Sequence, residues 1–160
     1  MPNVTASVVI AHPAEVVWEY IIHPDHLHNV LPGIVSVDAG KDPPYVPGDV
    51  WHGVSRSFGI TNRWTGVFER VDAPTMMEFR LTDSRFPVTT IDTLDEIAGG
   101  TRYTCRVIGE PSLGGPLGRF FDAVVSRAIK RSMTKQQAKL PAHVDAWALQ
   151  KGLTADPPTS

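Results

Sequence analysis

The feature that most constrains the fold is the stretch from Gly48 to Gly109, where short strand-like segments follow one another with only tight turns between them. Gly59, the DAPT of residues 72–75 and the AGG of residues 98–100 mark these turns. Parallel strands need crossover connections of about a dozen residues or more, and this stretch has no room for them. The sequence therefore predicts an antiparallel meander.

Further segments flank the meander. Residues 4–10 alternate between apolar and polar positions, which is typical of a half-buried strand. Two short helices over residues 13–22 and 24–31 are predicted next, followed by a strand that begins near residue 34. From about Leu117 to about Leu149 apolar residues recur at helical spacing. A helix of that length would exceed the width of the domain, so we expect a bend at Pro141, whose ring removes a backbone hydrogen bond.

Length and composition fit one globular domain. The chain has 160 residues, 42% of them hydrophobic and 20% charged, and no apolar run approaches the roughly 18 residues that span a bilayer. We expect one domain over residues 1–150 and a loose polar tail over residues 151–160. The start lacks the basic and apolar regions of a signal peptide, and the single Cys105 cannot form an internal disulfide. A cytoplasmic location is therefore expected.

Five segments carry a family resemblance. They are IAHPAEVVWEYI followed by LPGIVSV, then WTGVFERVDAPTMMEF, GGTRYTCRV and the long terminal helix. In this order they resemble the SRPBCC superfamily of START and Bet v 1-like proteins, and most of all its polyketide cyclase/dehydrase and lipid transport branch. The resemblance covers about residues 3–148. It implies an α+β helix-grip fold, in which a curved antiparallel sheet of about seven strands wraps around a long C-terminal helix, with two short helices after the first strand.

The resemblance also implies an apolar cavity between the sheet and the helix, because a strongly curved sheet and one helix cannot fill the volume between them. The expected function is binding of a small or medium hydrophobic molecule, such as a lipid, a polyketide or an aromatic metabolite. The alternative is a cofactor-independent polyketide cyclase, aromatase or dehydratase with acid–base residues in the cavity. The motifs mark strand ends, turns and core positions, so they do not decide between the two. No cofactor is expected under either hypothesis.

Strand alternation predicts which side chains point into the cavity. Cyclisation needs a general base beside a carbonyl, with His52 or Asp92 as candidates, and a donor that stabilises the enolate, with Arg56 or Tyr103 as candidates. The alternative is that these four residues pair with one another or with solvent at the pocket mouth. The residues expected to contact the ligand are Asn62, Trp64, Phe68, Met77, Phe79, Leu81, Thr90, Phe121, Val124 and Ala128.

The histidines raise the question of a metal site, because His12, His23, His26 and His28 all fall within residues 9–33. A zinc site needs three or four converging ligands, and the last three histidines cannot all share one helix face at spacings of three and two. We interpret them as surface or portal-lining residues and expect no metal. His12 is expected to face solvent, and Cys105 is interpreted as a small core residue.

Positive charge is concentrated in the terminal helix. Residues 116–144 hold six Lys or Arg and one Asp, a net charge of +5, whereas residues 1–115 hold eight Lys or Arg and fourteen Asp or Glu, a net charge of −6. Arg127, Arg131, Lys135 and Lys139 are spaced four apart and share a helix face. A solvated face is the ordinary interpretation, and the alternatives are contact with an anionic membrane or an acidic acyl carrier protein. The slightly acidic chain argues against nucleic acid.

Overall fold

The structure, a computed structural model, describes residues 3–57, 59–84, 87–109 and 115–152, apart from the side chains of residues 115, 117, 118 and 121. Most of the predicted tail lies outside these residues. The elements follow the predicted order: β1 (Asn3–Ile10), α1 (Ala14–Ile21), the 3-10 helix η1 (Pro24–His26), α2 (Leu27–Val30), β2 (Ile34–Asp38), β3 (Val50–Ser57), β4 (Ile60–Asp72), β5 (Met76–Asp83), β6 (Val88–Ile97), β7 (Gly100–Gly109) and α3 (Gly115–Gln150).

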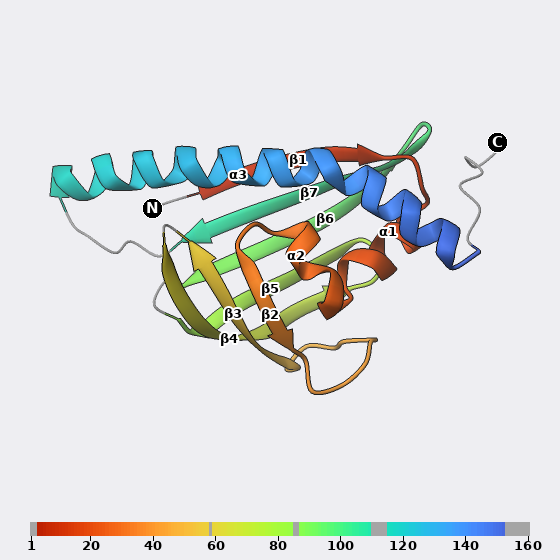
Figure 1. The fold of residues 1–160 in the computed structure, drawn as a ribbon, viewed down its shortest axis with the longest axis horizontal. Helices are drawn as coiled ribbons and strands as arrows, with labels where there is room; N and C mark the ends of the chain where they lie inside the picture. Colours follow the sequence, from red (N-terminus) through yellow and green to blue (C-terminus); the bar gives the residue numbers. More distant parts are fainter. Residues whose placement is uncertain (1–2, 58, 85–86, 110–114, 153–160) are drawn as a thin grey trace.

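The seven strands form one antiparallel sheet in the order β1-β7-β6-β5-β4-β3-β2 (Figure 1). The meander from β2 to β7 is confirmed, and β1 joins it by pairing with β7. Register shifts interrupt the β4–β5 ladder beside Thr65 and Phe68, and irregularities of this kind increase the local twist and bend of a strand. The curled sheet and the long C-terminal helix are the predicted helix-grip fold.

Helix α3 packs mainly along β1 and also contacts α1 and α2. Its core face is formed by Met133, Leu140 and Val144, which recur at helical spacing and are each at most 2% exposed. Pro141 lies inside the helix, and Figure 1 shows the C-terminal turns inclined to the rest of α3, in agreement with the expected bend. No bilayer-spanning helix is found in the described part of the chain, because none combines the necessary length and hydropathy.

Two glycines in the sheet make room for aromatic rings on its inner face. A Cβ atom at Gly53 would lie 2.1 Å from the Trp64 ring, and one at Gly66 would lie 2.3 Å from the Phe79 ring. Both distances are far below van der Waals contact, so a side chain at either position would displace the ring. The rings of Phe68 and Phe79 are 5.0 Å apart and edge-on, an arrangement that aromatic pairs favour.

His12 is buried, so the prediction that it faces solvent is wrong. Its side chain is 1% exposed, and its Nε2 lies 2.6 Å from Oδ1 of Asp145 on α3. The Thr101 hydroxyl donates to the His12 carbonyl at 2.7 Å. A turn before a helix is usually solvated. Here the distant helix α3 packs over the turn, and the imidazole is therefore covered.

Candidate functional site

The inner face of the sheet collects most of the predicted site residues in cross-strand rows. Phe79 on β5 lies opposite Thr90 on β6, and Thr90 lies opposite Val107 on β7. In the next inward-facing row, two residues further along these strands, Met77 lies opposite Asp92, and Asp92 lies opposite Cys105. The predicted inward orientation is also found for Asn62, Trp64 and Phe68 on β4, for Leu81 on β5 and for Tyr103 on β7.

Burial of this face increases steadily along β6. Val88 is partly buried, whereas Thr90, Asp92 and Leu94 are 8%, 6% and 3% exposed. The neighbouring strands follow the same gradient: Phe79, Leu81 and Val107 are partly buried, and Met77, Cys105 and Tyr103 are buried. The inner face is therefore more accessible at one end, which we call the accessible end and define by Phe79, Leu81, Val88 and Val107.

A buried polar group lies beyond the accessible end. The Tyr103 hydroxyl donates a hydrogen bond of 2.5 Å to Oδ1 of Asp92, and the Cys105 thiol is also hydrogen-bonded to this carboxyl. Burial raises the pKa of Asp92 to about 6, and the two hydrogen bonds oppose this rise. Burial and the neighbouring Asp92 charge raise the pKa of both Tyr103 and Cys105. Only the carboxyl of this group changes its protonation state near neutral pH.

Gln137 on α3 is a further buried polar side chain, and the sequence prediction missed it. It is 3% exposed, and its Nε2 donates to the Ala6 carbonyl at 3.1 Å. Ala6 lies opposite Cys105, so this amide is bonded to the strand that pairs with β7, which carries Tyr103 and Cys105. Its Oε1 is buried without a hydrogen-bond partner among the described residues. The signal in the sequence is a glutamine at a core position of the helix, between Met133 and Leu140.

The predicted orientation of β3 is wrong, and with it the placement of His52 and Arg56. Both side chains are exposed on the outer face, where His52 Nδ1 lies 3.0 Å from Oγ1 of Thr65. Trp51 is 4% exposed and takes the inner face together with Gly53. The alternation of the valines on this strand indicated the opposite face, because valine also suits an exposed strand. The structure thus brings together Asp92 and Tyr103 and separates the other two candidates from them.

The three α3 residues expected at the ligand differ in position. Ala128 is partly buried, Val124 is 52% exposed, and the Phe121 side chain lies outside the described residues. Leu140 and Val144 lie on the core face of α3. At about 100° per residue, Val124 lies on the opposite side of the helix from them, so it does not face the sheet. The expectation of a ligand contact at Val124 is therefore wrong.

Two of the hollows that border the described residues lie beside β2, at the edge of the sheet. One of about 390 Å³ lies at β2, β3 and β4, and its lining includes His52 and Arg63 of the outer face as well as Gly53 and Trp64 of the inner face. The other, of about 280 Å³, lies between η1, α2 and β2. The deep cavity implied by the resemblance stays a prediction.

The histidines after α1 form part of an aromatic contact. The His26 ring stacks on Tyr20 with centroids 4.1 Å apart, and both rings meet the edge of Trp147 on α3. Burial lowers the pKa of His26. No group of three or more potential ligands that could hold a metal is found among the described residues. These histidines thus contribute to the packing between the short helices and the end of α3.

Comparisons with known proteins agree with this architecture. The family described as "Polyketide cyclase / dehydrase and lipid transport" matches residues 1–145. No match was found among curated proteins.

Solved structures at 12–19% identity share the fold. TTHA0849 from Thermus thermophilus has a TM-score of 0.74 and 19% identity, with 92% of this chain and 99% of that one covered. A START superfamily protein from Mycobacterium smegmatis has a TM-score of 0.62 and 12% identity, covering 86% and 98%. The di-domain ARO/CYC BexL from the BE-7585A biosynthetic pathway has a TM-score of 0.63 and 17% identity, covering 89% of this chain and 50% of that one.

The match over residues 1–145 and the helix-grip architecture lead to one conclusion. The chain belongs to the polyketide cyclase/dehydrase and lipid transport family.

Proposed function

We propose that the chain binds a small or medium apolar molecule at the accessible end of the inner face, with a hydroxyl or carbonyl group of that molecule directed towards Asp92. The observation that carries the proposal is the burial gradient. Apolar side chains are partly exposed at the accessible end, and the buried carboxyl lies two to four residues further along the same strands.

The apolar side chains supply the affinity. Covering apolar surface contributes about 25 cal/mol per Å² removed from water, so a ring of naphthalene size gains several kcal/mol before the cost of association. Phe79 adds an aromatic surface on which a ring can stack or meet an edge.

The polar group supplies orientation. Below its pKa of about 6 the Asp92 carboxyl carries a proton and can donate to a carbonyl, and above that pH it can accept from a hydroxyl. A ligand without either group would leave the carboxyl in its present hydrogen bonds. We therefore expect a hydroxylated ring to bind more tightly than the same ring without a hydroxyl.

Calorimetry with 2-naphthol and naphthalene tests this proposal. We expect tighter binding of 2-naphthol in the wild type, loss of binding of both probes in Val88→Trp, and loss of the preference for 2-naphthol in Asp92→Leu. Val50→Trp is the matched control, because Val50 is a 41% exposed valine on the outer face of β3. Unchanged binding in Val88→Trp, with circular dichroism showing the native fold, would contradict the proposed site.

A second candidate function is acid–base catalysis of an intramolecular aldol cyclisation, and the raised pKa of Asp92 favours it. A carboxylate with a pKa of about 6 is a stronger base than an ordinary one and remains ionised at neutral pH. It would take the proton beside a ketone carbonyl, and the enolate carbon would form a bond to a second carbonyl of the same molecule. The alkoxide would then take the proton back from Asp92. Once Asp92 has taken the proton, its carboxyl no longer needs the hydrogen bond from Tyr103, and this hydroxyl, 2.5 Å from the carboxyl, can donate to the enolate oxygen instead.

Exchange of the α-protons of α-tetralone in deuterated water, followed by NMR, separates this candidate from binding alone. The enzyme hypothesis predicts an exchange rate that rises as pH increases through about 6, since the base must be ionised, and that falls to the background in Asp92→Asn. Equal rates in the wild type and Asp92→Asn would leave binding as the function. An acyl carrier protein is a partner that only this second candidate requires. His52 and Arg56 have no role in it.

A further inference from the structure

The first half of α3 carries apolar side chains that face water. Phe120 is 67% exposed and Val124 is 52% exposed, although both lie on a helix whose second half contributes to the core. Arg127, Arg131 and Lys135 follow them and are also exposed. We call these five residues the outer stripe of α3.

The outer stripe is one continuous surface. At about 100° per residue, its members fall within an arc of about 80°, on the opposite side of the helix from Met133, Leu140 and Val144. Figure 1 shows the first turns of α3 extending past the ends of β1 and β7. A flat partner can therefore approach the stripe without meeting the sheet.

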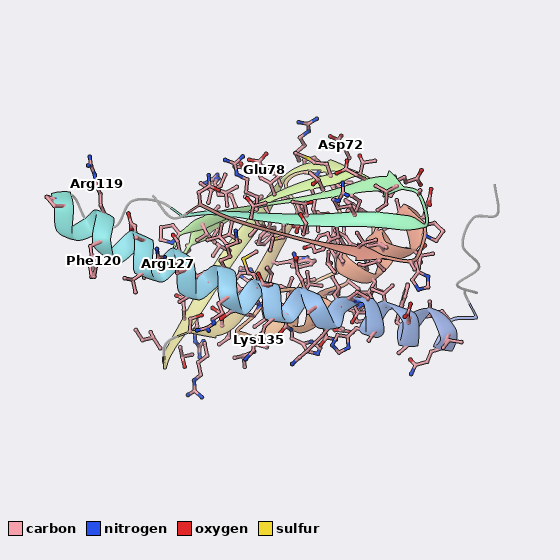
Figure 2. All side chains as sticks on the ribbon, turned by 90° about the horizontal axis from the view of Figure 1, so that it is seen from above. Asp72, Glu78, Arg119, Phe120, Arg127 and Lys135 are labelled. Carbon is pink, nitrogen blue, oxygen red and sulfur yellow. The ribbon has the colours of Figure 1, made fainter. Side chains whose placement is uncertain are left out.

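The cations of the stripe are available to a partner. None of Arg127, Arg131 and Lys135 forms an ion pair with an acidic side chain in the described part of the chain. Residues 116–144 carry a net charge of +5 against −6 for residues 1–115. Figure 2 shows Asp72 and Glu78 on the side of the sheet away from α3. This separation of charge would orient the molecule with α3 towards an anionic surface.

We propose that the outer stripe of α3 docks on an anionic lipid bilayer. In this arrangement Phe120 and Val124 enter the boundary between headgroups and acyl chains, and Arg127, Arg131 and Lys135 contact the lipid phosphates. Apolar side chains beside cations on one helix face are the usual composition of interfacial helices, and long basic side chains keep their charged ends at the headgroups. The cations alone would also suit an acidic protein, but an exposed phenylalanine on a protruding turn gains more from a bilayer, whose soft surface can admit it.

The purpose of this surface rests on the proposed function, since a bilayer can supply apolar ligands to the site and receive them from it. The vesicle-binding assay itself needs no ligand. The probe is a vesicle of phosphatidylglycerol and phosphatidylcholine in equal parts, compared with phosphatidylcholine alone, in a cosedimentation assay. We expect binding to the anionic vesicle only, weakening with added salt.

The variants separate the stripe from general electrostatics. Each cation near an anionic surface contributes roughly a fivefold change in affinity, so Arg127→Glu/Arg131→Glu should weaken binding by at least about 25-fold. Arg102→Glu/Arg106→Glu on the outer face of β7 makes the same change in net charge and should leave binding within about threefold. Phe120→Ser should weaken binding without changing the charge.

Three outcomes would overturn the docking proposal: no binding of the wild type to the anionic vesicle, equal losses in the two double variants, or binding to an acidic carrier protein in place of the vesicle. Calorimetry of 2-naphthol on the same variants keeps the two proposals apart. Retained 2-naphthol binding with no vesicle binding refutes docking alone, and the reverse result refutes the ligand site alone.

Discussion

The two halves of α3 have a similar amphipathic sequence and different surroundings. From Met133 onwards the helix contributes buried apolar side chains, and Gln136, Gln137 and Asp145 tie it to α2, β1 and the turn after β1 through hydrogen bonds of 2.6, 3.1 and 2.6 Å. Before Met133 the outer stripe leaves Phe120 and Val124 in water. Burial is thus a property of what the rest of the chain places beside each face of a helix, and the face without such a neighbour is the one open to a partner.

The largest difference should appear in the free energy of unfolding when each half loses two apolar side chains. Leu140→Ala/Val144→Ala removes two side chains that are 0% exposed and should cost about 4 kcal/mol or more, because cavities remain in the core. Phe120→Ala/Val124→Ala should change the same quantity by less than about 1 kcal/mol. Urea unfolding followed by circular dichroism measures both. Similar costs would mean that the first half of α3 is packed in solution.

The next effect concerns Asp92, which lies on β6 in the buried part of the inner face. Burial raises its pKa from 3.8 to about 6 in the folded state, so between these values the folded state holds the proton more tightly than the unfolded state. Wild-type stability should therefore fall as pH rises from about 4 to about 6 and then level off, by an amount on the order of 3 kcal/mol. Asp92→Asn should lack this decline, as measured by urea midpoints against pH. Parallel profiles would show that the carboxyl is not buried in solution.

A smaller effect is expected where the end of α3 meets the turn after β1. Asp145→Ala removes the hydrogen bond to the buried His12 and should cost about 1 kcal/mol, since Asp145 is 57% exposed and water can take its place. Asp145→Asn retains an acceptor and should cost less. Thermal unfolding of the two variants checks this order, and a cost of several kcal/mol for either would mean that the contact is shielded from water.

The smallest effect should come from Gln137→Met. The exchange removes one hydrogen bond to Ala6 and also removes a buried oxygen without a partner, so the two changes nearly cancel and stability should stay within about 1 kcal/mol. Binding of 2-naphthol should fall if the amide oxygen contacts the ligand. A large loss of stability with unchanged 2-naphthol binding would assign Gln137 a structural role only.

Much of the site could be read from alternation, and the exceptions have identifiable causes. Asp92 and Tyr103 were placed on the inner face because Leu94 and Cys105 share their parity on long regular strands. On β3 the same reasoning failed, because the large ring of Trp51 decides the inward face. Gln137 was missed because the sequence does not show which segment will pack against a polar residue on an apolar helix face.

The sequence by itself determined the elements, their order and the antiparallel meander, because turn residues and hydrophobic periodicity act over a few residues. Only the tertiary structure decided that His12 is buried, that Asp92 and Tyr103 meet, and that Phe120 remains in water. These outcomes depend on which distant segments come into contact. Burial stabilises a side chain only where another segment covers it, and the periodicity of one segment does not say which other segment will do so.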